Sequence, residues 1–393
     1  MTIPAPGIGR RERPAPGRIA ELLRVFGKLG IIGFGGPTAH IALFEDEIVS
    51  KRGWISRDQF VDALAATNII PGPNSTEMAV HVGYRRAGVF GAVVAGAMFI
   101  APAFLMMIVL SWAYFRWSGV AAVSDVFDGI KPAVIAVIVV TLWRLFKSSV
   151  RDVPQFGLMA AAGALAYAFT AWEPLILIAA GLAGVALYTK PGDYPRLPLR
   201  VVVPWPLLGL PLAAAFFAWR PGELGGLAIV FLRAGGLLFG GGYVMIPLIQ
   251  DSVTKQHGWL TQRQFLDGVA LGQATPGPII ITATFVGYAA AGLTGAAVAT
   301  VAVFAPAFIL AIVAGNFLER VRSWKMATAF LKGVGPAVVG TIAAVSVELG
   351  RDAITGGWTA AIAVAGLALA WRYGPLHALV FAGASGIAIG RLS

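Results

Sequence analysis

The sequence predicts an all-α polytopic membrane protein made of two homologous repeats in opposite orientations, with broken helices and about 9–13 membrane segments. Of the 393 residues, 58% are hydrophobic and only 12% are charged, and long apolar runs recur to the C-terminus. A soluble domain carries roughly 25% charged residues, so lipid is the expected solvent. The other two observations are a long-range match of the chain with itself and a reversal of basic residues between the matched parts.

Composition also excludes several kinds of site and partner. The chain has no cysteine and only four scattered histidines, so we expect neither disulfides nor a metal centre. The net charge of +11 does not indicate nucleic-acid binding, because the basic residues sit at the ends of apolar segments, as the positive-inside rule requires. No catalytic triad order, zinc-protease motif or phosphate-binding loop stands out, so we expect no enzyme and no cofactor.

The internal match keeps its register over about 100 residues. Phe34-Gly35-Gly36 falls on Phe239-Gly240-Gly241 at an offset of 205, and 15 of the 40 positions from 34 to 73 are identical. The offset then becomes 204, at which Pro132 meets Pro336. Unrelated apolar helices would not hold this register, so the sequence indicates duplication.

Basic residues at matched positions indicate how each repeat is oriented. Arg85-Arg86 in the first repeat corresponds to Ala289-Ala290 in the second. The bias reverses in the next loop and again in the one after, where the first repeat has Arg144, Lys147 and Arg151 and the second has Glu348, Arg351 and Asp352. Successive reversals predict inverted repeats, a usual build of secondary transporters.

The expected organisation is a disordered cytoplasmic tail at 1–18, a first repeat at 19–190, a connecting segment with one short apolar stretch at 191–222, and a second repeat at 223–393. Apolar segments are expected at 19–50, 57–84, 89–115, 120–146, 156–171, 173–188, 203–218, 224–250, 262–289, 291–318, 326–347, 357–371 and 375–391. A spanning helix needs about 20 residues, so the shortest segments either tilt, thin the bilayer or fail to cross, and the Gly/Pro-broken ones either cross or form re-entrant hairpins.

Two glycine-rich breaks are candidate binding elements. Glycine weakens a helix and proline removes a backbone donor, so we expect a break between half-helices in each repeat, unless the small residues serve close helix packing. Lys28 and Arg233 each precede a break by six residues, and such cations either contact a ligand or extend to the membrane interface. The break residues themselves are Gly35, Gly36, Pro37 and Thr38 in the first repeat and Gly240, Gly241 and Tyr243 in the second.

Two Pro-Gly-Pro sequences predict helix starts that suit an anion. Pro71-Gly72-Pro73 stops one helix, and Asn74 or Ser75 then caps the next, whose free N–H groups and positive dipole end favour negative charge. Asn74, Ser75 and Thr76 are therefore candidate binding residues. Pro276-Gly277-Pro278 lacks these polar residues but has Thr282 nearby. The alternative is a plain proline kink.

Four titratable residues inside the apolar segments are candidates for proton coupling or for ion pairs with the cations. Asp62 and Asp267 occupy matched positions, whereas Glu77 and His81 occur in the first repeat alone. A structural ion pair is the plainer role for the carboxylates, and a hydrogen-bonded packing role is the plainer one for the histidine.

The motifs Phe34-Gly35-Gly36-Pro37-Thr38-Ala39-His40 and Pro71-Gly72-Pro73-Asn74-Ser75-Thr76, with their second-repeat echoes, resemble the chromate ion transporter family in its long two-domain form. The resemblance covers most of residues 20–350. It implies an inner-membrane permease that exports chromate, with sulfate as a competing analogue. It departs at Gly242-Tyr243, where the first repeat has Pro37-Thr38.

We therefore expect broken helices of both repeats, with Lys28 and Arg233, to hold an oxyanion near the bilayer midplane while the repeats alternate access. Membrane potential or ion exchange would drive export. The alternatives are a carrier of another anion such as sulfate, or an intramembrane enzyme acting on a lipid phosphate. A homodimer is compatible with each of these functions.

Overall fold

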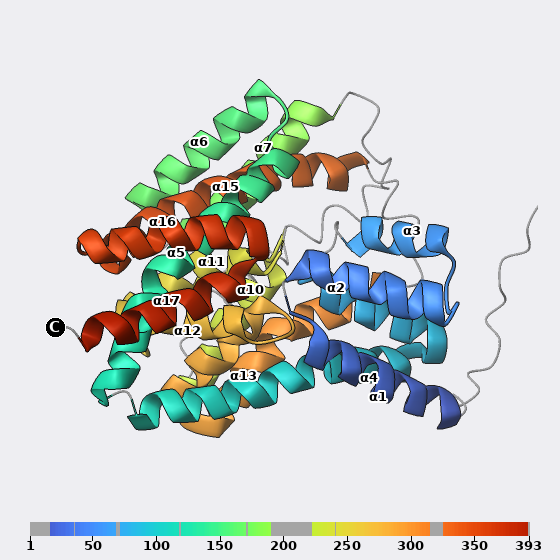
Figure 1. The fold of residues 1–393 in the computed structure, drawn as a ribbon. Helices are drawn as coiled ribbons and strands as arrows, with labels where there is room; N and C mark the ends of the chain where they lie inside the picture. Colours follow the sequence, from blue (N-terminus) through green and yellow to red (C-terminus); the bar gives the residue numbers. More distant parts are fainter. Residues whose placement is uncertain are drawn as a thin grey trace, which may run out of the picture.

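The computed structural model describes residues 16–34, 36–67, 71–117, 119–169, 172–189, 222–239, 241–314 and 325–391, and all regular structure within them is helical. Figure 1 shows the bundle. In the first repeat the helices are α1 (Pro16–Ile32), α2 (Pro37–Phe44), the π-helical turn η1 (Glu45–Lys51), α3 (Arg57–Thr67), α4 (Asn74–Trp117), α5 (Ala121–Ser149), α6 (Val153–Ala168) and α7 (Glu173–Tyr188). In the second they are α10 (Glu223–Gly236), η3 (Gly242–Val244), α11 (Met245–Asp251), η4 (Ser252–Gln256), α12 (Gln262–Ala274), η5 (Ile279–Ile281), α13 (Thr282–Ala314), α15 (Lys325–Ala353), α16 (Gly357–Tyr373) and α17 (Pro375–Gly390).

The helices have the length and composition of a membrane protein. Within the described residues, four stretches are long and apolar enough to cross a bilayer, namely α4, α5, 279–313 and α15. The apolar helices α6, α7 and α17 have 16 residues each, or about 24 Å of helix, which is somewhat less than a hydrocarbon core of about 30 Å. The all-α membrane fold is confirmed, and the number of full crossings stays a prediction.

The first predicted segment of each repeat is a hairpin rather than one interrupted helix. Phe26 of α1 packs edge-on against Phe44 of α2 with ring centroids 5.7 Å apart, and Lys28 Nζ lies 3.0 Å from Glu47 Oε2. A helix running straight from 28 to 47 would separate those residues by about 28 Å, so the chain turns back at the glycine break. In the second repeat, Gly226 of α10 likewise lies close to His257 beyond η4. Of the two alternatives predicted for the broken segments at 19–50 and 224–250, a crossing or a hairpin, the structure has the hairpin.

The second predicted segment of each repeat also folds back, at the Pro-Gly-Pro sequence. In the second repeat, Gly268 of α12 lies against the ring of Phe285, and Gly272 lies against Thr282, so α12 and the start of α13 run antiparallel. In the first repeat α3 packs on α4. The segments predicted at 57–84 and 262–289 are thus hairpins whose second arms continue, after a bend at Gly88 and Gly292, into the long parts of α4 and α13.

Backbone hydrogen bonds between the repeats are reciprocal. The N–H of Gly72 donates to the carbonyl of Leu238 at 2.9 Å, and the N–H of Gly277 donates to the carbonyl of Gly33 at 2.7 Å. The two donors are matched positions, and so are the two acceptors. Such an exchange is what a pseudo-two-fold axis between two copies produces. Each Pro-Gly-Pro turn therefore contacts the chain just before the glycine break of the other repeat.

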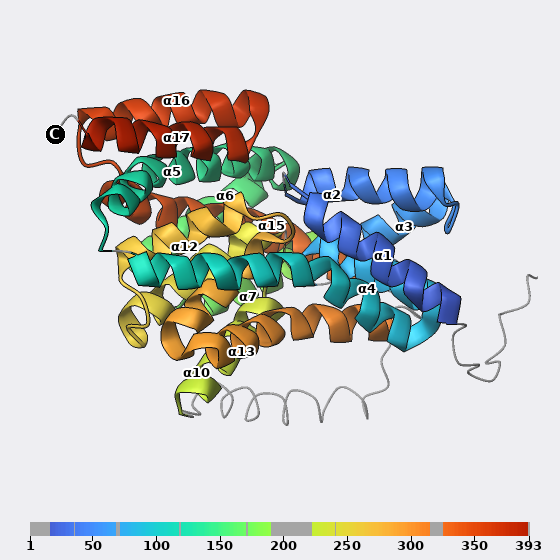
Figure 2. The ribbon, with the colours of Figure 1, turned by 60° about the horizontal axis from the view of Figure 1, so that its bottom comes forward.

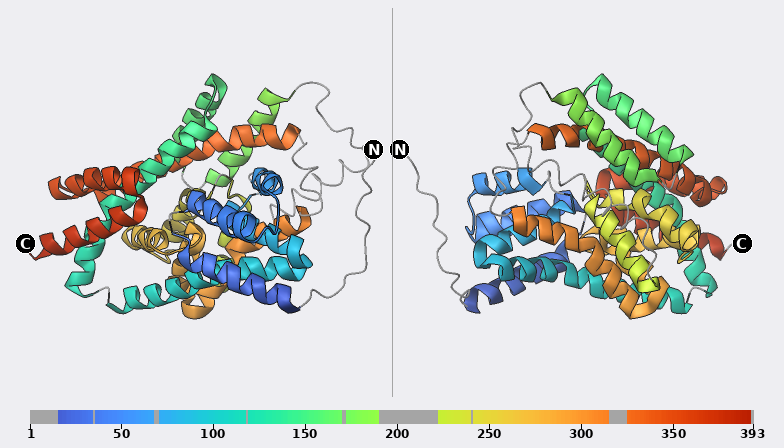
Figure 3. Two further views of the ribbon diagram at one scale, coloured as in Figure 1. Left: turned by 45° about the vertical axis from the view of Figure 1, so that its right-hand side comes forward. Right: turned by 180° about the vertical axis from the view of Figure 1, so that it is seen from behind.

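The C-terminal helices of each repeat cross over to the other repeat. Figure 1 and Figure 3 show α6 and α7 beside α15, whereas α16 and α17 lie along α5. Small residues allow these contacts, because Gly184 meets the backbone of Gly333 and Gly129 meets that of Gly386. Figure 2 shows α4 and α13 running alongside each other below. The repeats are therefore interlocked, and most of the connecting segment predicted at 191–222 lies outside the described residues.

Candidate functional site

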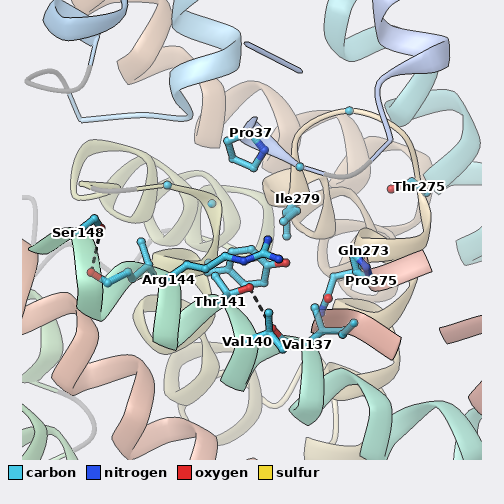
Figure 4. A pocket seen from close by; sticks show the side chains of 17 residues that line it. Pro37, Val137, Val140, Thr141, Arg144, Ser148, Gln273, Thr275, Ile279 and Pro375 are labelled. Atoms are coloured by element: carbon cyan, nitrogen blue, oxygen red, sulfur yellow. Dashed lines mark hydrogen bonds between the residues drawn. The ribbon is translucent and has the colours of Figure 1, made fainter. Parts of the chain in front are cut away.

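A central cavity of about 220 Å³ lies where the two repeats meet. The start of α2, the start of η3 and the second Pro-Gly-Pro turn form one side of it, and α5 forms the other. Figure 4 shows this cavity from close by, with Pro37 and Gln273 on separate walls and Arg144 reaching in from α5. The lining residues are Gly36, Pro37, Val137, Val140, Thr141, Arg144, Leu145, Ser148, Gly241, Gly242, Tyr243, Gln273, Thr275, Gly277, Ile279, Ala370 and Pro375.

Three helix starts face this cavity. Gly36 precedes α2, Gly241 precedes η3 and α11, and Gly277 lies just before η5 and α13. The first N–H groups of a helix have no partner within that helix, and they form the positive end of its dipole. Both breaks turn at a glycine with positive φ, 78° at Gly36 and 120° at Gly241, a conformation that L side chains rarely adopt. The glycines therefore let backbone donors converge on one space.

The polar face of α5 supplies the only charged side chain among the described residues of the lining. Thr141, Arg144 and Ser148 follow one another at intervals of three and four residues, so they share a face of the helix. No ion pair within the described parts of the chain involves Arg144. Because none of the described lining residues is acidic, the side chains that line the cavity carry a net positive formal charge.

Neutral polar groups complete the lining. Gln273 is only 7% exposed, yet its amide nitrogen and oxygen both lack a hydrogen-bond partner among the described groups. A buried amide with unused hydrogen-bonding capacity is costly unless a ligand or water satisfies it. Tyr243 and Thr141 line the same cavity, and the Thr141 hydroxyl donates to the carbonyl of Val137 at 3.0 Å.

The structure brings five of the predicted residues to this cavity, namely Gly36, Pro37, Gly241, Tyr243 and Gly277. It does not bring the two predicted cations there. Lys28 pairs with Glu47 across the first hairpin. Arg233 lines a separate cavity of about 90 Å³ together with Glu173 and Asp251.

The polar residues after the Pro-Gly-Pro sequences lie elsewhere in the packing. Asn74 is partly buried and Ser75 and Thr76 are buried in the first turn of α4, and none of them lines the cavity. The Thr282 hydroxyl donates to the carbonyl of Ile279 at 3.0 Å and so caps its own turn. The prolines Pro71, Pro73, Pro276 and Pro278 flank the two turns. Gly35 and Gly240 and the side chain of Thr38 lie outside the described residues.

The predicted titratable residues have four different environments. Asp62 is exposed on α3, whereas its match Asp267 is buried in α12 and accepts a hydrogen bond of 2.8 Å from the Tyr114 hydroxyl. Glu77 is fully buried, and neither of its carboxyl oxygens has a described hydrogen-bond partner. His81 lies one turn further along α4 and is also buried. None of the four lines the central cavity, so their coupling role stays a prediction.

Sequence reasoning missed Thr141, Arg144 and Gln273 as site residues. In the sequence Arg144 indicates topology, because it lies at the end of the apolar segment predicted at 120–146, whereas α5 continues to Ser149. A signal was present in the polar residues at 141, 144 and 148, which recur with a helical period on an otherwise apolar segment. Gln273 gave no such signal, because only the fold of the turn brings it to the cavity.

Comparison with known proteins identifies the family. The chromate transporter family matches residues 20–185 and 225–389, one match in each repeat. The chain is 32% identical to a probable chromate transport protein of Synechococcus elongatus, over 91% of each chain. It is 30% identical to the chromate transport protein of Cupriavidus metallidurans, over 93% of this chain and 92% of that one. It is 37% identical to the chromate transport protein of Pseudomonas aeruginosa, over 86% and 82% respectively.

No solved structure matches the chain. The family match covers most of the sequence, and each of the three relatives extends over more than four fifths of it. The protein is therefore a multi-pass membrane transport protein rather than an enzyme, and it belongs to the chromate transporter family.

Proposed function

We propose that this protein exports chromate from the cytoplasm across the inner membrane and that the dianion binds in the central cavity. The observation that carries the proposal is Arg144, a cation without an ion-pair partner among the described residues, placed opposite three helix starts. The guanidinium group of an arginine can donate to two oxygens of an oxyanion at once, and backbone N–H groups at helix starts can donate to the remaining oxygens. The names of the relatives supply the substrate.

The cavity suits a small oxyanion better than an organic acid. Its volume of about 220 Å³ is several times the share of one water molecule, which is about 30 Å³ in the liquid. A tetrahedral anion fits this space with some of its water. Sulfate has the same shape and charge, so it competes for the same groups.

Alternating access follows from the inverted repeats predicted by the basic residues. The reciprocal hydrogen bonds of Gly72 and Gly277 support two equivalent units that pivot about a shared centre. With the N-terminus inside, α5 starts outside and ends in the cytoplasm, so Arg144 lies on the cytoplasmic half of its helix. The cavity in this structure is then the site from which cytoplasmic chromate is taken up.

Membrane potential alone supplies enough energy for export. One elementary charge crossing 100 mV gains about 2.3 kcal/mol, so a dianion leaving a negative interior gains about 4.6 kcal/mol, or roughly a thousandfold gradient. Export in this scheme requires no nucleotide.

Chromate flux into inside-out vesicles tests the site. Arg144→Ala should lower initial uptake at least about tenfold, since a charge-assisted contact is worth about 1.5–3 kcal/mol. Arg144→Lys should retain part of the rate, because it keeps the charge and loses the fork. Lys147→Ala is the matched control, since Lys147 lies three residues further on α5, over the Trp143 ring, and does not line the cavity.

Sulfate added in excess should inhibit the uptake of labelled chromate by the wild type. Wild-type flux in Arg144→Ala vesicles with equal protein content would contradict the proposed site. Absence of flux in the wild type would contradict the proposed substrate.

A further inference from the structure

One ion pair joins the repeats at the start of α5. Arg263 Nη2 on α12 lies 2.7 Å from Asp128 Oδ1 on α5, and the same guanidinium group donates to the Ser124 hydroxyl at 3.0 Å. Asp128 also accepts from Lys131 at 2.6 Å. This pair holds a short helix of the second repeat against a long helix of the first, and α12 packs along α5 around it.

At the matched positions of the other repeat, the acidic residue is replaced by a basic one and the basic residue by an acidic one. Asp128 is the eighth residue of α5, and the eighth residue of α15 is Lys332. Arg263 is the second residue of α12, and the second residue of α3 is Asp58. Each substitution alone would place like charges opposite each other, so the two changes compensate and preserve a potential ion pair between α3 and α15.

That second pair is not formed in this structure. Within the described residues, neither Asp58 nor Lys332 takes part in an ion pair. Both are exposed, and Lys332 Nζ lies over the ring of Tyr188, 5.1 Å from its centroid. The pseudo-two-fold symmetry seen in the central turns is therefore broken at these two contacts.

We propose that Asp128–Arg263 and Asp58–Lys332 are alternating gates, one formed in each of the two access states. The inference rests on the proposed function, in which inverted repeats exchange conformations. When the repeats exchange conformations, the contact between α12 and α5 opens and the equivalent contact between α3 and α15 forms. In the predicted orientation α5 starts outside and α15 starts in the cytoplasm, so the present structure is closed outside, and Asp58–Lys332 closes the cytoplasmic face.

The exposure of the formed pair suits a gate. The side chains of Arg263 and Asp128 are 54% and 36% exposed, and ion pairs with that much solvent contact contribute little net stability. A weak contact on each face keeps the two states close in free energy, so that a bound anion can shift the population.

Cross-linking tests the gates directly, because the natural chain has no cysteine. Asp128→Cys/Arg263→Cys should cross-link with a short, reducible bifunctional thiol reagent in vesicles without chromate. Asp58→Cys/Lys332→Cys should cross-link slowly without chromate and faster during chromate turnover, while the first pair slows. Arg57→Cys/Lys332→Cys is the matched control, since residue 57 is adjacent to 58 and points to a different side of α3.

Charge reversal provides the second measurement. Asp58→Lys or Lys332→Asp alone should slow chromate uptake by about fivefold or more, the loss expected for an exposed pair turned repulsive. The double variant Asp58→Lys/Lys332→Asp should recover at least half of the wild-type rate. Recovery that accompanies turnover-dependent cross-linking supports the gates.

The gate inference is overturned if wild-type vesicles carry chromate but the Asp58–Lys332 cysteine pair cross-links no faster than the control pair, or if the double reversal gives no recovery. Wild-type flux is measured in the same preparations. Failure of the proposed function would therefore show as missing wild-type flux, which is a separate result.

Discussion

At the scale of single residues, the Pro-Gly-Pro turns need glycine for two reasons. Gly277 has a φ of 91°, and a Cβ atom added there would lie 3.1 Å from the Cβ of Ala103. Its N–H also donates to the carbonyl of Gly33 in the other repeat. A single backbone position thus sets the local turn and links the two repeats.

Gly277→Ala should destabilise the protein by about 1–3 kcal/mol, the usual cost of holding an L residue in a disfavoured backbone conformation. The midpoint temperature of aggregation in detergent measures this. Gly236→Ala is the control, because that glycine has negative φ and no heavy atom within 4 Å of an added Cβ. Equal midpoints for the two variants would show that the turn tolerates a side chain.

The charged residues show what spacing along the sequence does not reveal. Spacing before the glycine breaks favoured Lys28 and Arg233, but the hairpin fold turns Lys28 toward Glu47 and leaves Arg144 of a distant helix at the cavity. The match between repeats could not reveal this, because Arg144 corresponds to Glu348, which pairs with Lys255 instead. Candidate site residues that are not repeated at the matched position can be found only from the tertiary structure.

At the scale of helices, small residues fix how the repeats interlock. Gly129 of α5 lies against the carbonyl of Ala382 and the backbone of Gly386 on α17, and Gly333 of α15 makes the corresponding contact with Gly184 on α7. In a bilayer, close backbone approach replaces the hydrophobic effect as the source of helix affinity. These contacts determine which helices lie beside the cavity wall.

Gly129→Leu should separate α17 from α5 and destabilise the protein by about 3 kcal/mol, the upper end for an overpacked contact. Gly157→Leu on α6 should have little effect, because no heavy atom lies within 4 Å of an added Cβ there. Yield of monodisperse protein after size-exclusion chromatography distinguishes the two. A normal yield for the first variant would contradict the close approach.

The sequence predicted the helix ends that depend on local signals. The segment predicted at 173–188 coincides with α7, and that at 120–146 differs from α5 by a few residues. Apolar periodicity does not show whether a helix continues or turns back at a glycine, so the sequence does not decide between a crossing and a hairpin at 19–50 and 57–84. The direction in which the chain continues after the glycine depends on contacts between residues far apart in sequence, such as that of Phe26 with Phe44.

At the scale of the whole molecule, the duplication seen in the sequence explains the shared centre. Matched glycines break matched hairpins, and matched backbone groups exchange hydrogen bonds across the centre. The proposed binding and gating roles fall on residues that break the symmetry, since Arg144 and the Asp128–Arg263 pair have no equivalent in the other repeat within the described residues. Orientation of the repeats relative to the bilayer is the remaining premise of the transport scheme.

Labelling of single cysteines in intact cells tests that premise most directly. Arg85→Cys and Ala289→Cys replace matched residues just before the bends of α4 and α13, in a chain with no other cysteine. A membrane-impermeant maleimide should label residue 289 from outside and reach residue 85 only after the cells are opened. Labelling of both positions from the same side would contradict inverted repeats and with them the alternating access proposed for this chain.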